Sequence, residues 1–215
     1  MFGYETIIHF VLAVVAILFA IILHEIAHGL VALWNGDNTA KLSGRLTLNP
    51  LAHFDLVGFV MLVLMRFGYA KPVPINPYNF KRRKLGMFTV AIAGIALNLI
   101  LAFVAVPLLI ISKNEFLSIF LSYFILININ LAVFNILPIY PLDGSRILEC
   151  FIGRNNGVMR FLEKYSLYVI VVLFGLGIVR DMFNLPIYFD PLSLYINYAR
   201  GFIIDIFEKF WLLII

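Results

Sequence analysis

His24-Glu25-Ile26-Ala27-His28 is the stretch around which the rest of the sequence is organised. The run before it, from Thr6 to Leu23, is apolar apart from Thr6 and His9. That run alone approaches the length of a helix that crosses a bilayer. We therefore predict a membrane-spanning helix from about Thr6 to Leu33, with the pentad toward its C-terminal end.

Within such a helix, the pentad has the geometry of a metal site. Residues four apart lie on the same face, so His24 and His28 can offer two imidazoles to one metal ion. Glu25 lies about 100° around the helix from His24, where it can reach a metal-bound water without being a ligand. Two histidines and a glutamate in this order are typical of zinc hydrolases. Ionisable groups are costly inside a membrane and are usually functional there, which favours a site over simple packing.

The composition excludes an ordinary soluble protein. The chain has 215 residues, of which 63% are hydrophobic and 13% are charged, whereas a soluble domain carries about 25% charged residues. The net charge of +4 comes from basic residues between apolar segments, so it indicates membrane topology and not nucleic-acid binding. The single Cys excludes an internal disulfide and a zinc site made of several Cys. We predict an all-α membrane protein, a polytopic helical bundle forming one domain over residues 1–215.

Three further helices are predicted, over about Gly86 to Ser112, Phe116 to Leu142 and Phe161 to Val179. The last segment, Leu194 to Ile215, contains several charged residues among its aromatic and aliphatic ones. It could cross the membrane with neighbouring helices or lie in the interface, and we favour the interface. The core of the domain is expected over about 6–153, followed by C-terminal helices over about 161–215.

Two segments between the first two long helices do not have a helical pattern. Lys41 to Asn49 alternates between apolar and polar residues, which is the two-residue period of a strand. Such a strand could pair with an unwound substrate by edge addition, or it could be an ordinary surface strand. Leu56 to Met65 is apolar but short, so we expect it to dip into the membrane and return, or to lie at the interface. Together they predict a short strand and re-entrant region near the cytoplasmic face.

Asp143 is the candidate for a third ligand. Pro138 and Pro141 must loosen the helix before it, and broken backbone at membrane depth is tolerated where it is buried in protein or lines a wet cavity. Two His and one carboxylate leave a fourth zinc position for water, as a catalytic zinc requires. His53 and Asp55 are also possible ligands, although we expect them to form hydrogen bonds within a loop.

Asn98 and Asn135 are polar residues within predicted spanning helices. Gly94 and Asn98 share a helix face, where Gly permits close approach of another helix and Asn can form hydrogen bonds between helices. The simplest interpretation of both Asn residues is packing between helices. The alternative is that one or both hold an unwound substrate.

With these motifs together, the chain resembles the site-2 protease family of intramembrane zinc metalloproteases, in its compact prokaryotic form without a PDZ domain. The resemblance covers about residues 20–150. It is carried by the pentad, by Leu142-Asp143-Gly144 and by segments that begin at Asn49, Lys71 and Asn135. It implies that His24, His28 and Asp143 bind one zinc ion and that Glu25 is the catalytic acid and base. One departure is Ile95, which stands where the family often has Pro.

The expected function is zinc-dependent intramembrane hydrolysis of peptide bonds in membrane-spanning substrates. The alternative is a membrane transporter or binding protein for metal ions or protons that uses the same His and Asp residues. For the ligands to meet, both ligand-bearing helix ends must lie on one side, and most basic residues lie there too. Because the positive side is cytoplasmic, we expect a multi-pass protein of the cell membrane with its zinc site nearer the cytoplasm. The substrate and the oligomeric state are left open.

Overall fold

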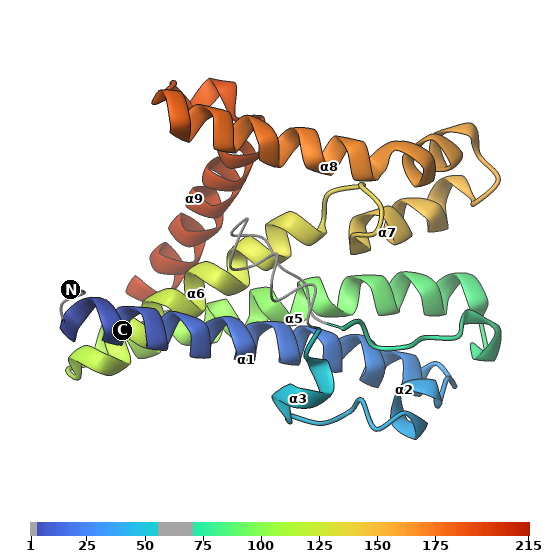
Figure 1. Cartoon of the computed structure of the whole chain (residues 1–215). Coiled ribbons are helices and arrows are strands. Elements are labelled where there is room, and N and C mark those ends of the chain that lie inside the picture. Colours follow the sequence, from blue (N-terminus) through green and yellow to red (C-terminus); the bar gives the residue numbers. More distant parts are fainter. Residues whose placement is uncertain (1–3, 56–70) are drawn as a thin grey trace.

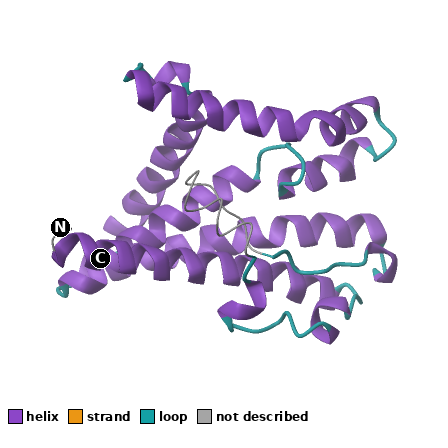
Figure 2. Ribbon diagram, viewed as in Figure 1, coloured by secondary structure: helices purple, strands orange, loops and turns teal. Residues whose placement is uncertain are grey.

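The computed structural model describes residues 4–55 and 71–215, and all regular elements in these ranges are helical (Figures 1 and 2). The long helices are α1 (Tyr4–Trp34), α5 (Arg83–Ile111), α6 (Glu115–Asn135), α8 (Gly157–Phe183) and α9 (Pro191–Leu212). The short ones are α2 (Thr39–Leu42), α3 (Pro50–His53), η1 (Pro77–Asn79), α7 (Asp143–Ile152) and η2 (Ile187–Phe189). The prediction of a multi-span helical protein is confirmed, since α1, α5, α6 and α8 are long and apolar enough to cross a membrane.

The centre of the molecule is formed by α1, α5 and α6, which pack against one another and lie side by side in Figure 1. Many of the buried residues in these helices are small: Ala16, Ala20, Ala27, Ala32, Ala91, Ala102, Ala105 and Ala132. Small side chains allow close approach of helix backbones, which is how helices associate where lipid removes the usual hydrophobic driving force. The close packing of α1 and α5 allows α5 to contact His24 and His28 of α1.

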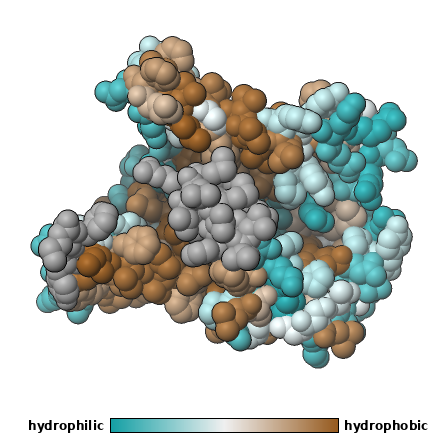
Figure 3. Space-filling view, viewed as in Figure 1, coloured by the Kyte–Doolittle hydropathy of each residue, from teal (hydrophilic) through white to brown (hydrophobic). Residues whose placement is uncertain are grey.

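The largest hydrophilic area in Figure 3 lies at the end of the bundle where α1 ends and α5 begins. The two helices are joined there by a hydrogen bond from Lys81 N to Asn35 O of 3.0 Å. Because α5 starts beside the end of α1, the two helices run antiparallel.

The predicted strand over Lys41 to Asn49 is wrong. The Asp37 carboxylate accepts a hydrogen bond from Thr39 N of 3.1 Å, and a helical turn, α2, follows at once. Ala40 of this turn is fully buried, and Gly44 has a φ of +65°, which an extended strand does not allow. The apolar and polar alternation therefore comes from a helical turn and a loop. The prediction for Leu56 to Met65 lies outside the described residues.

The second correction concerns the end of α6. The helix was predicted to reach Leu142, but it ends at Asn135. Pro138 and Pro141 lack the backbone N–H that would continue the helix, and Pro also restricts the residue before it. The chain therefore leaves the helix early and turns back into α7, which begins at Asp143.

At the C-terminus, α8 and α9 form a second arm of the molecule (Figure 1). The buried Asp190 caps α9 by accepting a hydrogen bond from Ser193 N of 3.0 Å. From there α9 runs obliquely across α5 and α6. Tyr195 Oη donates to Val133 O at 3.2 Å and Trp211 Nε1 donates to Phe103 O at 2.9 Å. The sequence leaves α9 spanning or interfacial, and in the structure it packs against two central helices.

Candidate metal centre

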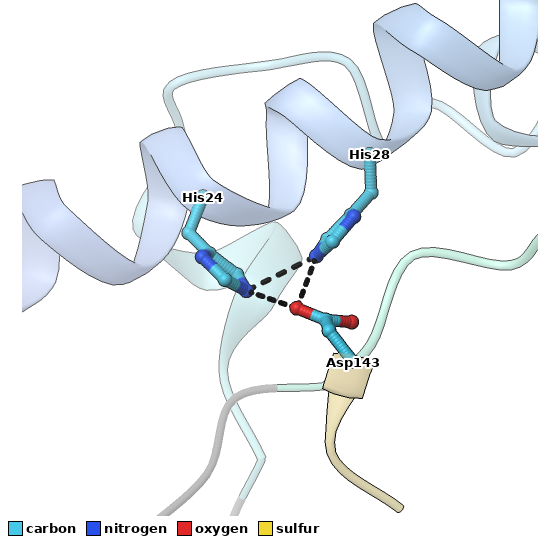
Figure 4. A group of neighbouring side chains, drawn as sticks. All are labelled: His24, His28 and Asp143. Carbon is cyan, nitrogen blue, oxygen red and sulfur yellow. Dashed lines mark hydrogen bonds and ion pairs between the residues drawn. The ribbon is translucent and has the colours of Figure 1, made fainter. Parts of the chain in front are cut away.

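Two histidines from α1 point toward the same place at the polar end of the bundle (Figure 4). His24 and His28 are one helical turn apart, and their Nε2 atoms are 3.0 Å apart. Both residues are only 6% exposed. The two imidazoles therefore lie on one face of α1 and point toward a common centre.

Asp143 reaches the same point from the first residue of α7 (Figure 4). Its Oδ2 atom is 3.2 Å from His24 Nε2 and 3.2 Å from His28 Nε2. Gly144 makes this approach possible, because a Cβ there would lie 2.2 Å from Ile136 O. The break between α6 and α7 thus brings the Asp143 carboxylate to the two imidazoles, although Asp143 lies 115 residues after His28 in the sequence.

The far nitrogen of each imidazole is held by α5. His28 Nδ1 donates to Val90 O at 2.7 Å, and His24 Nδ1 donates to Asn98 Oδ1 at 3.2 Å. Since both acceptors are oxygens, each ring carries its proton on Nδ1 and directs the Nε2 lone pair toward the centre. Outer hydrogen bonds of this kind fix the orientation of metal-binding histidines.

Gly94 of α5 completes the enclosure of the two rings. A Cβ at this position would lie 2.5 Å from His24 Cε1 and 2.6 Å from His28 Nε2. The helix backbone therefore passes directly beside the imidazoles. A Gly is required at this point because any side chain would collide with the rings.

The three central atoms fit a zinc ion. They are all electron-pair donors within 4.8 Å of one another, and Oδ2 of Asp143 is buried without a hydrogen-bond partner. Three acceptors at 3.0 to 3.2 Å from one another repel unless a cation lies between them. Tetrahedral zinc with bonds of about 2.0 to 2.1 Å holds its ligand atoms about 3.3 Å apart. Two nitrogens and one oxygen are also a donor set that zinc accepts, with a fourth position for a small molecule.

Glu25 is next to this cluster in the sequence but its carboxylate is held elsewhere. Oε2 of Glu25 accepts a hydrogen bond from Val73 N of 2.8 Å. Val73 belongs to the proline-rich loop, defined here as residues 71–76, and its side chain is 6% exposed. The loop therefore reaches over α1 and holds one oxygen of the glutamate.

Sequence reasoning missed the residue that anchors this loop. Asp37, fully buried, accepts hydrogen bonds from Asn76 N at 2.7 Å, from Asn79 Nδ2 at 2.8 Å and from Thr39. Burial alone would raise the pKa of Asp37, but hydrogen bonds from Thr39, Asn76 and Asn79 outweigh it and hold the pKa below its usual value. The available signal was the Asp-x-Thr pattern in a turn, which favours local capping. Its long-range partners leave no pattern in the sequence.

The remaining candidates differ in position. Asn98 contacts the centre through His24, whereas Asn135 donates to Leu131 O in its own helix at 3.0 Å. His53 is 3% exposed, and its Nε2 lies 2.9 Å from Thr47 O. The prediction that His53 forms hydrogen bonds within a loop agrees with this contact.

Comparison with known proteins identifies the class. The sequence model of "Peptidase family M50" matches residues 110–177, which include Asp143 but not the pentad. A Bacillus subtilis protein, "Putative zinc metalloprotease YwhC", is 39% identical over 172 residues, covering 75% of this chain and 78% of the relative. The chain therefore belongs to peptidase family M50, the site-2 protease family, and is a zinc metallopeptidase. This membership decides against the predicted alternative of a transporter.

Two further relatives agree with this class. "Putative zinc metalloprotease Rip2" of Mycolicibacterium smegmatis is 28% identical over 216 residues, covering 94% of this chain and 81% of the relative. "Zinc metalloprotease MJ0392" of Methanocaldococcus jannaschii is 32% identical over 108 residues, covering 45% of this chain and 32% of the relative. No solved structure gave a significant match.

Proposed function

We propose that this metallopeptidase is an intramembrane endopeptidase that hydrolyses peptide bonds of membrane-spanning substrates. The observation that carries the proposal is that Asp143, at the start of α7, meets His24 and His28 of α1, a helix long enough to cross a membrane. A site built into the bundle in this way is accessible to a substrate that lies within the same bilayer. We further propose that the protein is a multi-pass component of the cell membrane with this site nearer the cytoplasm.

His24, His28 and Asp143 are the residues that would hold the zinc ion. When bound, zinc supplies a Lewis acid that activates water and polarises a carbonyl group. Val90 and Asn98 keep both imidazoles in the tautomer that presents Nε2 to the ion. The single negative charge of Asp143 partly balances the charge of the ion, as is common in catalytic zinc sites with two His and one carboxylate.

Glu25 is the group to which we assign the proton transfers. Val73 N holds Oε2 of its carboxylate, so Oε1 is the oxygen that takes a proton from the attacking water. The same oxygen then returns the proton to the leaving amine as the peptide bond breaks. The contact with Val73 restricts the rotamers of Glu25, and this reduces the entropy lost in reaching the reactive geometry.

Asn98 is the candidate contact for the substrate, with Asn135 as a weaker one. Asn98 is fully buried, its Oδ1 is used by His24, and its Nδ2 has no hydrogen-bond partner in the described part of the chain. The free amide N–H of Asn98 beside the cluster can donate a hydrogen bond to a carbonyl oxygen of an unwound substrate. The substrate must unwind because the carbonyl groups of a helix are otherwise engaged in its own hydrogen bonds.

The test is proteolysis of a single-span test substrate by the purified chain in detergent, before and after removal of zinc by a chelator. We expect cleavage within the apolar segment, loss of cleavage in the zinc-free chain, and recovery when stoichiometric zinc is returned. Cleavage that persists in the fully zinc-free chain would contradict the proposal. So would a zinc-loaded chain that cuts only outside the membrane-spanning segment of the substrate.

A further inference from the structure

A second concave surface lies away from the metal centre, between the beginning of α5 and the end of α7. The α5–α7 groove, as we call it, has a volume of about 550 Å³. That volume is in the range of sites that hold small molecules. Its lining residues are Arg82, Arg83, Lys84, Leu85, Phe88, Cys150 and Phe151. None of these residues takes part in the chemistry proposed above.

The floor of the groove is apolar. The rings of Phe88 and Phe151 meet edge to face with their centroids 5.9 Å apart, and Cys150 is buried beside Lys84 O. Phe151 is nevertheless 70% exposed and Leu85 is 49% exposed. Aromatic and aliphatic side chains that remain open in a membrane protein are surfaces on which hydrocarbon chains can pack.

The rim of the groove is basic. Arg82, Arg83 and Lys84 are exposed, and none of the described lining residues is acidic. Arg83 lies over the ring of Tyr78 at 4.7 Å, and none of the three forms an ion pair with an acidic group in the described ranges. Arg83 also borders a second cavity, which is lined by Glu149 and Glu163 as well as by Arg146 and Arg154, whereas Arg82 and Lys84 line only the groove. Arg82 and Lys84 therefore have no ion-pair partner among the described residues, and their positive charges are available to a ligand.

We propose that the α5–α7 groove binds one anionic phospholipid, with its phosphate at Arg82 and Lys84 and an acyl chain along Phe88 and Phe151. The groove opens where a candidate membrane span begins, which is the depth at which headgroups lie. The first turn of α5 also attracts the phosphate. Its N-cap, Arg82, provides no side-chain acceptor, so the backbone amides of this turn remain available to an anion. A free anion would leave the apolar floor unfilled, and an uncharged lipid would leave the basic rim unpaired.

The position of the groove gives this lipid a structural consequence. The same α5 that forms one wall carries Val90 and Asn98, which orient the two histidines. The same α7 that forms the other wall begins with Asp143. A lipid seated between the two helices therefore joins the two halves of the metal centre, and a bound ligand stabilises the folded state that binds it.

The test is native mass spectrometry on the 215-residue chain, titrated with phosphatidylglycerol and, separately, with phosphatidylcholine of the same acyl chains. We expect one phosphatidylglycerol to be retained at least tenfold more tightly than phosphatidylcholine. A basic residue near a membrane surface contributes about fivefold to binding of anionic lipid. Arg82→Gln with Lys84→Gln should therefore weaken binding about 25-fold, and each single substitution about fivefold. Phe151→Ala should weaken binding several-fold through loss of chain contact.

The matched control is Arg160→Gln with Lys164→Gln, which removes the same charge from exposed positions on α8. This control should bind within about twofold of the unaltered chain, and 10 mM inorganic phosphate, a large molar excess over micromolar lipid, should not displace the lipid. Equal retention of the two lipids would overturn the proposal. An equal loss in the α8 control would assign the effect to overall charge, and unaltered binding by Phe151→Ala would place the lipid outside the groove. Displacement by phosphate would show a simple anion site instead. The single substitutions, at exposed positions, decide the matter if the double variant does not fold.

Discussion

At the scale of single residues, the metal centre consists of three acceptor atoms that receive no hydrogen bond from a protein donor. Val90 O and Asn98 Oδ1 occupy the Nδ1 protons of the two histidines, so the Nε2 atoms and Asp143 Oδ2 face one another as three acceptors. The pentad indicated the two imidazoles because the spacing of four residues is itself the geometry. Val90 could not be identified in advance, since a backbone carbonyl has no signature in the sequence.

The first prediction concerns the three ligands. The purified chain should contain one zinc per molecule, and both His28→Ala and Asp143→Ala should lose it. The loss of affinity should exceed the ~10- to 100-fold typical of outer hydrogen-bond partners, because a coordinating atom is removed. Metal analysis after gel filtration measures this directly. His53→Ala is the matched control, because it removes a buried histidine that bonds to a loop carbonyl. Full zinc content in the His28 and Asp143 variants would remove these residues from the site.

At the scale of elements, two features position the site. They are the close packing of α5 on α1 and the hydrogen bonds of the proline-rich loop to Glu25 and Asp37. The sequence predicted the long helices because their apolar length is a strong local signal. The prediction failed for residues 41–49. There the hydrogen bond from Thr39 N to the Asp37 carboxylate starts a helical turn, and Gly44 adopts a left-handed backbone conformation. The sequence analysis also placed the end of α6 too late. Pro138 and Pro141 restrict the residues that precede them, so the helix already ends at Asn135.

The second prediction tests the contact of α5 with the histidines. Gly94→Ala places a Cβ 2.5 to 2.6 Å from atoms of His24 and His28, so the rings or the helix must move. Both rings are held by hydrogen bonds, so we expect the zinc affinity to fall about 10- to 100-fold, as for loss of an outer hydrogen-bond partner. A competition titration with a chromophoric chelator measures the affinity. Gly175→Ala on α8, where nothing lies within 4 Å, should leave it unchanged. Wild-type affinity in Gly94→Ala would show that the packing is looser than described.

The third prediction concerns Asp37 and the loop it anchors. Asp37→Ala leaves the amides of Asn76 and Asn79 without their acceptor, and we expect a loss of about 3 kcal/mol in stability and early proteolysis within the loop. Since the folded-state pKa of Asp37 is lowered, its stabilisation is full at neutral pH and is lost as the pH falls below about 4. Thermal unfolding between pH 7 and pH 3 measures both effects. Asp37→Asn should show a smaller loss of stability with acid, and an acid dependence identical to that of the unaltered chain would exclude this role.

At the scale of the whole molecule, the metal centre lies toward the end of the bundle that carries the basic cluster Lys81 to Lys84 at the start of α5. Figure 3 shows many hydrophilic residues at the end where α1 finishes and α5 begins, with smaller hydrophilic patches at the tip of the α8–α9 arm and at the opposite end of the bundle. The sequence analysis predicted that the ligands lie at one side of the membrane, because His24, His28 and Asp143 can meet only if the helix ends that carry them lie on the same side. It did not predict how α9 packs. That depends on bonds from Tyr195 and Trp211 to carbonyl groups 62 and 108 residues away.

The fourth prediction is that this end faces the cytoplasm. A Lys84→Cys substitution in a Cys150→Ser background should resist an impermeant thiol reagent in intact cells and react after the membrane is opened. Lys113→Cys in the same background is the control for the opposite end, because Lys113 lies directly after Ser112, the C-cap of α5, and it should be labelled in intact cells. Labelling in the reverse order would invert the topology.

The central claim is that Glu25 moves the protons while two histidines and an aspartate hold the metal, and Glu25→Gln tests it most directly. Gln keeps the shape of the side chain and can still accept the hydrogen bond from Val73 N, but it cannot accept a proton. The measurement is cleavage of a single-span test substrate in detergent, with the zinc content determined on the same sample. We expect the rate to fall by about 10²- to 10⁴-fold, the usual contribution of a general acid and base, with zinc fully retained. Cleavage near the wild-type rate, or loss of zinc from the variant, would contradict the role assigned to Glu25.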